Sequence, residues 1–211
     1  MLLTAAAINE LSICEGDVAL FETPIALEPA AGGGHSIGDS ALEAADIIVS
    51  TTHAGTSRVI RIGTVSVVSH AALYIGSGYV IEAIGEGVKR RDLRQSLADD
   101  VLAVAYRSPA MNQAIANRIV KYATAQQGIP YSVPGAAMSA DKVLCRIVGP
   151  QPASFFCSQL VFEAYRRAGL PLADTPSQCV TPKDVAVIAR RRLVYVGHLL
   201  GHAGWFPIFE P

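Results

Sequence analysis

The sequence has no long hydrophobic run and no excess of charge of either sign. No stretch of its 211 residues is apolar over the length that a membrane span requires. Lysine and arginine number 17 and aspartate and glutamate 18, so no basic surface for nucleic acid is indicated. The N-terminal stretch MLLTAAAINELSICEGD has no cation ahead of its apolar residues, which Asn9 and Glu10 interrupt, so no signal peptide is predicted. We therefore expect a chain that is cytoplasmic in the producing cell.

Cysteine is also scarce. The four cysteines, Cys14, Cys145, Cys157 and Cys179, show no CxxC spacing and no small disulfide framework. They are predicted to be mostly reduced, and Cys145 and Cys179 are interpreted as packing residues. A bridge that involves Cys14 or Cys145 remains an alternative.

The composition, 51% hydrophobic and 17% charged, is sufficient for one sizeable core. We expect a single α+β domain over residues 1–211, with a core at about 44–187 and an extension of unclear role at 1–43. Strands are predicted at 11–23, 46–50, 64–76, 79–85, 101–108 and 193–198, and helices at 109–127, 155–168 and 182–192. Residues 88–100 are interpreted as a polar connection, and the proline-rich residues 129–154 as a cleft wall or lid.

One amphipathic helix carries a candidate nucleophile. In the stretch FFCSQLVFEAYRRAG, Ser154 is predicted to cap the helix and Gly169 to end it, which places Cys157 in the first turn. The free N–H groups and the positive end of the helix dipole favour a thiolate there. The alternative is that Cys157 is a small buried hydrophobic residue.

A hairpin supplies candidate partners for that thiol. If the loop is Gly76 to Gly78, Ile75 pairs with Tyr79, and His70 and Glu82 become diagonal neighbours on one face. A two-residue loop would move Glu82 to the opposite face. A thiolate, an imidazole and an orienting carboxylate are the parts that a cysteine hydrolase requires. The alternatives are a core histidine and a solvated glutamate.

The segments SHAALYIGSGYVIEA and, much later, FFCSQLVFEAY resemble the circularly permuted branch of the NlpC/P60 superfamily of papain-like cysteine peptidases. The resemblance covers roughly residues 44 to 187. It implies an α+β permuted papain-like fold, with an antiparallel sheet packed against the helix of the nucleophilic cysteine, and no cofactor. It further implies Cys157 as nucleophile, His70 as base and Glu82 as orienting residue, with Tyr74, Tyr131 and Ser158 as substrate-binding residues.

This resemblance also implies a reaction, which is cleavage of an amide bond through an acyl-enzyme, with a peptidoglycan peptide as the substrate class. Acyl-transferring relatives have a second histidine where this chain has Glu82, which favours the hydrolase side. An exported antibacterial effector with an immunity or secretion partner is one expectation. An acyl-lipid or thioester hydrolase or acyltransferase and a non-catalytic interaction domain are the alternatives.

His198 and His202 have the i, i+4 spacing of a helical metal pair. Gly197 and Gly201 disfavour a helix there, and no third ligand is evident, so no metal site is predicted.

Overall fold

A computed structural model of the protein describes residues 34–52, 68–149 and 154–200. In chain order its elements are η1 (Asp39–Ala41), β1 (Ile47–Thr52), β2 (His70–Gly76), β3 (Tyr79–Ile84), β4 (Gly87–Asp92), α2 (Leu93–Ser96), β5 (Asp100–Arg107), α3 (Gln113–Ala125), α4 (Val133–Met138), α5 (Leu144–Val148), α6 (Cys157–Arg167), η2 (Ser177–Cys179), α7 (Pro182–Arg192) and β6 (Val194–Leu200). Within these residues no helix combines the length and the apolar character needed to cross a bilayer.

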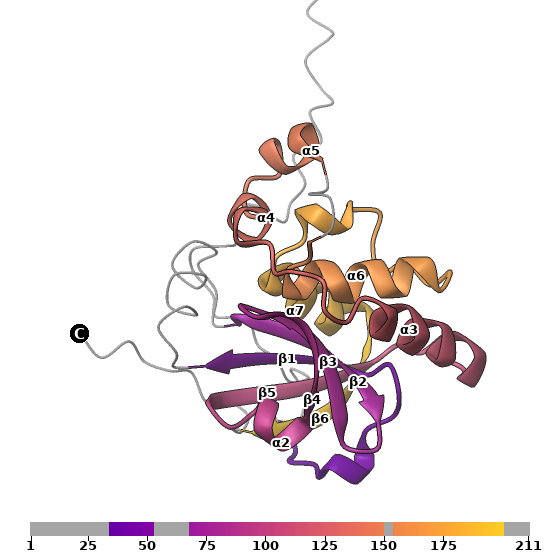
Figure 1. Ribbon diagram of the computed structural model, residues 1–211. Helices are drawn as coiled ribbons and strands as arrows, with labels where there is room; N and C mark the ends of the chain where they lie inside the picture. The colour runs from indigo at the N-terminus through magenta and orange to yellow at the C-terminus, as the bar shows by residue number, and fades with distance from the viewer. Residues whose placement is uncertain (1–33, 53–67, 150–153, 201–211) are drawn as a thin grey trace, which may run out of the picture.

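A six-stranded antiparallel sheet organises the fold, with the strand order β4-β3-β2-β1-β5-β6. The strand β2, which begins at His70, is therefore an interior strand, whereas β4 lies at an edge. Helices α3, α6 and α7 lie together on one side of the sheet, and α2 lies on the other (Figure 1). The predicted α+β class, with an antiparallel sheet against the cysteine helix, is confirmed.

Both faces of the sheet are apolar. On β2, Ala71 and Leu73 belong to the larger core with helix α6, whereas Ala72 and Tyr74 belong to a second core with Leu93 of α2. Strands that are buried on both faces have apolar runs instead of a clean alternation. This is why the interior strands were recognisable in the sequence.

The β2–β3 hairpin contains one extra residue. Leu73 pairs with Ile81 and Tyr74 with Val80, but Gly76 pairs with Tyr79, so Ile75 is bulged. The predicted pairing of Ile75 with Tyr79 is wrong. Because the bulge offsets a two-residue turn, the register that sets Glu82 near His70 is nevertheless the predicted one.

Several expectations need correction. The polar connection at 88–100 contains the edge strand β4 and helix α2. Helix α3 begins at Gln113 because the Asn112 side chain caps it. The segment 129–154, predicted to be irregular, contains α4 and α5.

The cysteine assignment is also corrected, because Cys145 and Cys179 form a disulfide. Cys157 is the one free cysteine among the described residues. The predicted strand at 11–23 lies outside the described residues, and so do Cys14 and His202. Ser36 forms a bridge with His198 of β6, and Leu42 is buried in the second core. The single-domain organisation over 1–211 stays a prediction.

Candidate active site

Helix α6 holds Cys157 at its first position. The residue before it, Phe156, has an extended backbone and is the N-cap, and no side chain caps the helix. The predicted Ser154 cap is therefore wrong, whereas Gly169 follows the helix with φ +84°, as expected for a stop. Because no side chain occupies the amide groups of the first turn, they remain able to stabilise negative charge beside the sulfur.

The thiol of Cys157 lies against the His70 imidazole. Cys157 is only 3% exposed, and burial alone would raise its pKa. The hydrogen bond to His70, the charge of that imidazole and the backbone N–H groups of Ala71 and Ser158 outweigh burial and lower the pKa of the thiol. For His70, burial alone would lower the pKa, but the contacts with Cys157 and Glu82 raise it well above its ordinary value. These directions favour a thiolate–imidazolium pair.

The second nitrogen of the imidazole is held by Glu82. Nε2 of His70 lies 2.6 Å from Oε2 of Glu82, whose side chain is 1% exposed. Nδ1 is thereby left for the thiol. The pKa of Glu82 is lowered because the His70 contact, the Ser96 hydroxyl and the charge of Arg91 together exceed the effect of burial.

The three predicted substrate-binding residues have different positions. Tyr131 forms a bridge with Phe155, and the pKa of its phenol is raised by burial and by the negative charge of Cys157. Tyr131 is therefore beside the thiol. Tyr74 is buried in the second core, where its hydroxyl accepts a hydrogen bond from the N–H of Gly78. It lies four residues after His70 along β2. Its hydroxyl is thus engaged within the hairpin, and its contact with substrate stays a prediction.

The Ser158 side chain has a partner within the fold, and its role in substrate binding stays a prediction. Its hydroxyl is fully buried and donates to the carbonyl of Val180 at 2.6 Å, so the side chain joins α6 to the segment before α7. Only its backbone N–H faces the sulfur.

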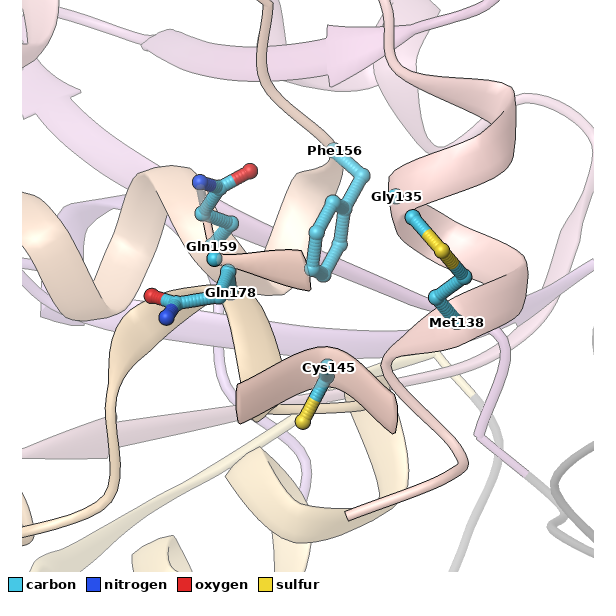
Figure 2. Close-up of a pocket in the computed structure, with 7 residues that line it drawn as sticks. Gly135, Met138, Cys145, Phe156, Gln159 and Gln178 are labelled. Atoms are coloured by element: carbon cyan, nitrogen blue, oxygen red, sulfur yellow. The ribbon is translucent and has the colours of Figure 1, made fainter. Parts of the chain in front are cut away.

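A small pocket lies next to the first turn of α6. It is lined by residues from α4, α5, α6 and η2, namely Gly135, Met138, Cys145, Gly149, Phe156, Gln159 and Gln178. Figure 2 shows the Phe156 ring and the Met138 side chain on one side and the two glutamine amides on the other. Helices α4 and α5, in the segment expected to be an irregular cleft wall or lid, thus line one wall of this pocket beside α6.

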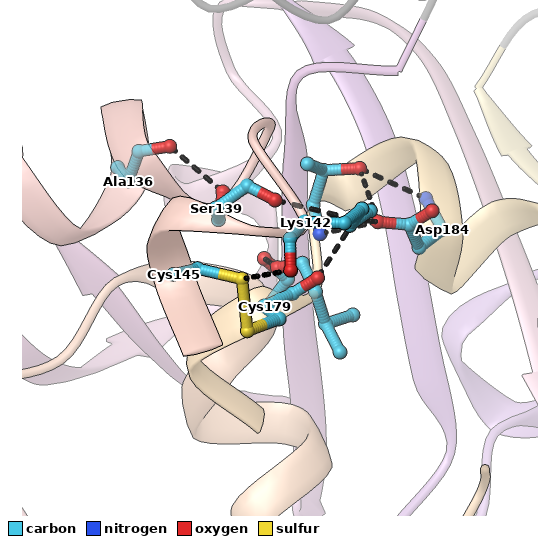
Figure 3. A network of polar contacts seen from close by, with 9 residues as sticks. Ala136, Ser139, Lys142, Cys145, Cys179 and Asp184 are labelled. Atoms are coloured by element: carbon cyan, nitrogen blue, oxygen red, sulfur yellow. Dashed lines mark hydrogen bonds and ion pairs between the residues drawn. A yellow bond between two sulfur atoms is a disulfide. The ribbon is translucent and has the colours of Figure 1, made fainter. Parts of the chain in front are cut away.

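A covalent bridge and a lysine hold this wall. The Cys145–Cys179 disulfide connects α5 to η2. Nζ of Lys142 donates to the Cys179 carbonyl at 2.7 Å and to the Asp184 carboxylate at the start of α7 (Figure 3). Few aliphatic side chains of α4 and α5 pack against the rest of the fold. The exposed ones are Val133, Val143, Leu144, Ile147 and Val148.

Of the two histidines with helical metal-site spacing, the structure describes only His198. His198 is buried on β6, and its Nδ1 bonds with the Tyr195 hydroxyl. No group of three or more His, Cys, Asp or Glu side chains suited to a metal occurs among residues 34–52, 68–149 and 154–200.

Sequence reasoning missed three polar groups around the site. Arg91 and Ser96 contact Glu82 from the segment taken as a connection. Asp100 lies close enough for its pKa, raised mainly by burial, to respond to His70 and Glu82. Residues 88–92, VKRRD, carry four consecutive charged side chains and lack the alternation of apolar and polar residues that would have indicated a strand.

Comparison with known proteins agrees with this fold. Residues 41–178 match the family described as permuted papain-like amidase enzyme, YaeF/YiiX, C92 family. The probable lipoprotein peptidase YaeF of Escherichia coli (strain K12) is 27% identical over an alignment of 194 residues, and the match covers 75% of this chain and 71% of YaeF. The crystal structure of metalloprotein yiiX from Escherichia coli O157:H7 superposes with a TM-score of 0.50 at 18% identity, covering 75% of this chain and 88% of yiiX, and so supports the fold. The chain belongs to the permuted papain-like amidase family of cysteine hydrolases.

Proposed function

We propose that the chain hydrolyses an amide bond with Cys157 as nucleophile, His70 as general acid and base, and Glu82 as the residue that orients His70. The observation that carries the proposal is the continuous contact from the thiol through the imidazole to a buried carboxylate at 2.6 Å. A nucleophile, a base and an orienting group in hydrogen-bond sequence form the arrangement of a catalytic triad.

The reaction follows from the positions of these groups. The Cys157 thiolate attacks the carbonyl carbon, and backbone N–H groups at the start of α6 stabilise the oxyanion. The His70 imidazolium then gives its proton to the leaving nitrogen, the C–N bond breaks and an acyl-thioester remains. In the second half His70 takes a proton from water, the hydroxide attacks the thioester, and the thiolate leaves with the release of a carboxylic acid. Glu82 remains ionised throughout and stabilises the imidazolium.

The substrate that we propose is a peptide of the bacterial cell wall. Its support is the family resemblance of the His70 and Cys157 segments. The decisive experiment is incubation of the wild type and Cys157→Ala with purified peptidoglycan, followed by mass analysis of the released fragments. Fragments from the wild type alone would support the substrate. Intact peptidoglycan in both samples, with Cys157 shown to be reactive, would exclude it.

A lipid-bearing substrate is the second candidate. The wall beside the cysteine helix exposes aliphatic side chains, with Val143 at 69% and Ile147 at 76% exposure. The relative YaeF is named a probable lipoprotein peptidase. Hydrolysis of an acylated peptide or of a thioester but not of peptidoglycan would favour this substrate.

We further propose that the chain acts outside the cytoplasm. The Cys145–Cys179 disulfide supports this location, because such bonds persist in oxidising compartments such as the bacterial periplasm. An exported effector that attacks neighbouring cells, with an immunity protein in the producer, is one role consistent with that location.

A further inference from the structure

The Glu82 carboxylate is bonded on both oxygens. Oε2 contacts His70 at 2.6 Å, and Oε1 accepts hydrogen bonds from the Ser96 hydroxyl at 2.9 Å and from Nη1 of Arg91 at 3.1 Å. A carboxylate with 1% exposure would bind a proton if it lacked such partners. The two donors on Oε1 therefore bear directly on the state of the group that contacts His70.

Both donors come from one compact unit at the sheet edge. Arg91 lies on β4 opposite Val80, so it shares a face with Glu82, two residues along β3. Its Nη2 donates to the carbonyl of Gln95 in α2 at 2.8 Å. One guanidinium thus joins α2 to the buried carboxylate.

The short helix α2 is itself fixed at its start and on its inner face. The Asp92 side chain accepts the N–H groups of Arg94 and Gln95, and Leu93 is buried in the second core. These contacts determine where the Ser96 hydroxyl lies.

We propose that Arg91 and Ser96 are positioning residues, which hold the Glu82 carboxylate in the orientation and the charge state in which it supports the His70 imidazole. The four groups form a line of alternating charge: the Arg91 guanidinium, the Glu82 carboxylate, the His70 imidazolium and the Cys157 thiolate. Arg91, with a side chain 32% exposed, is the end of this line that reaches solvent. Loss of Arg91 weakens the hold on Glu82, so the imidazolium loses support and the thiolate becomes less populated at neutral pH.

This inference rests on the proposed function, since it assigns roles within the same site. Its test is the pH dependence of Cys157 alkylation by iodoacetamide, with the modified residue identified by mass spectrometry and Cys157→Ala as the blank. Arg91→Met is expected to shift the midpoint of alkylation to higher pH by about one unit, which corresponds to about a tenfold loss of thiolate near neutral pH. Ser96→Ala is expected to shift it in the same direction by less.

A matched control stands one residue away. Arg90 is on the same strand, but its guanidinium lies 3.6 Å from the centroid of the Tyr79 ring. Arg90→Met removes a cation from β4 without touching Glu82, so its midpoint is expected to equal that of the wild type. Equal midpoints for Arg91→Met and Arg90→Met would overturn the proposal. If Arg91→Met does not fold, Ser96→Ala decides, because an unchanged midpoint in that folded variant has the same meaning.

A double variant shows whether Arg91 acts through Glu82. In that case Glu82→Gln with Arg91→Met has the same alkylation midpoint as Glu82→Gln alone, whereas additive shifts would overturn the proposal. Failure of the proposed function is a different result, since Cys157 of the wild type would then titrate as an ordinary thiol.

Discussion

The imidazole of His70 and the carboxylate of Glu82, twelve residues apart in the chain, meet at 2.6 Å because a bulge at Ile75 restores the hairpin register. Because the contact places Glu82 behind the imidazole and not at the thiol, the proposed mechanism predicts a different loss of turnover for each of the three residues.

Substitutions in the site are expected to differ in severity. Cys157→Ala and His70→Ala should abolish turnover, because each removes a group that bonds to a reacting atom or transfers a proton. Glu82→Gln should retain a fraction of kcat/KM, lower by roughly 10²–10⁴-fold, since an orienting residue is not part of the bond changes.

The matched control for Glu82 is Asp100→Asn, which alters a nearby carboxyl that bonds with Ser50. It should reduce kcat/KM far less than Glu82→Gln. If the two losses were reversed, Asp100 and not Glu82 would be the group that orients His70.

The pH profile of kcat/KM is expected to be bell-shaped. Activity requires the thiolate–imidazolium pair. It therefore rises with pH as Cys157 loses its proton, and this happens at a pH below 9.0, the ordinary pKa of a thiol. Activity falls again as His70 loses its proton, and this happens at a pH above 6.5, the ordinary pKa of an imidazole. Because the two groups interact, the two limbs report on the pair. Glu82→Gln should move the alkaline limb to lower pH, and an unmoved limb would contradict the stabilisation of the imidazolium by Glu82.

Removal of the disulfide is expected to destabilise the protein. The bridge joins residues 34 apart, and closing a loop of that size lowers the entropy of the unfolded chain by the equivalent of about 3–4 kcal/mol. The double variant Cys145→Ser with Cys179→Ser should lose roughly that free energy of unfolding, measured with urea. A dithiol reductant should lower the stability of the wild type and leave the double variant unchanged. An equal effect on both would mean that another group is reduced.

Acid is expected to loosen the far end of the cysteine helix. Glu163 of α6 accepts hydrogen bonds from Arg166, Arg167 and Ser177; burial opposes its ionisation, but these partners lower its pKa to about 2. A carboxylate whose pKa is lower in the folded than in the unfolded chain stabilises the fold at any pH above its unfolded pKa. For Glu163 this contribution is lost as pH falls from about 4.5 toward 2. Glu163→Gln should cost ~1–3 kcal/mol at pH 7. The difference from the wild type should shrink below pH 4, and a constant difference would contradict the ionised role.

The location of action leads to a two-compartment experiment. Expression in the cytoplasm should be harmless, whereas the same chain fused to a periplasmic signal should lyse the cells if peptidoglycan is the substrate. Cys157→Ala in the periplasm should be harmless too. Absence of lysis by a folded, detectable wild type would favour the lipid-bearing or thioester substrate.

Much of the site was predictable because it uses local patterns. The turn residues at 76–78 and the apolar strands on either side limit the hairpin to few registers, and the helical spacing after Phe156 places Cys157 in a first turn. These relations depend on neighbours in the sequence or on strand pairing across one turn.

The remaining features depend on partners that the sequence does not mark. Strand β4 lies at the edge of the sheet, where charged side chains such as Lys89 and Arg90 are tolerated, so it was taken for a connection. The Cys145–Cys179 bridge joins two separate segments without a recognisable spacing. Ser158 and Tyr74 were expected at the substrate from the family resemblance, which does not indicate that the Val180 carbonyl and the Gly78 N–H bond with their hydroxyl groups in this fold.

The position of Cys157 between Cys145 and Cys179 in the chain affects how the protein must mature. Among the cysteines that the structure describes, three thiols compete during oxidation, and a bond from Cys157 to either of the other two would consume the proposed nucleophile. Once α6 has packed against the sheet, Cys157 is 3% exposed and held by His70, so the thiols and disulfides of a protein chain reach it less readily than a small reagent does. Burial of the nucleophile therefore serves a second purpose: if the helix packs before the bridge closes, oxidation yields an active enzyme, and a catalyst of disulfide exchange should rescue chains that were oxidised too early.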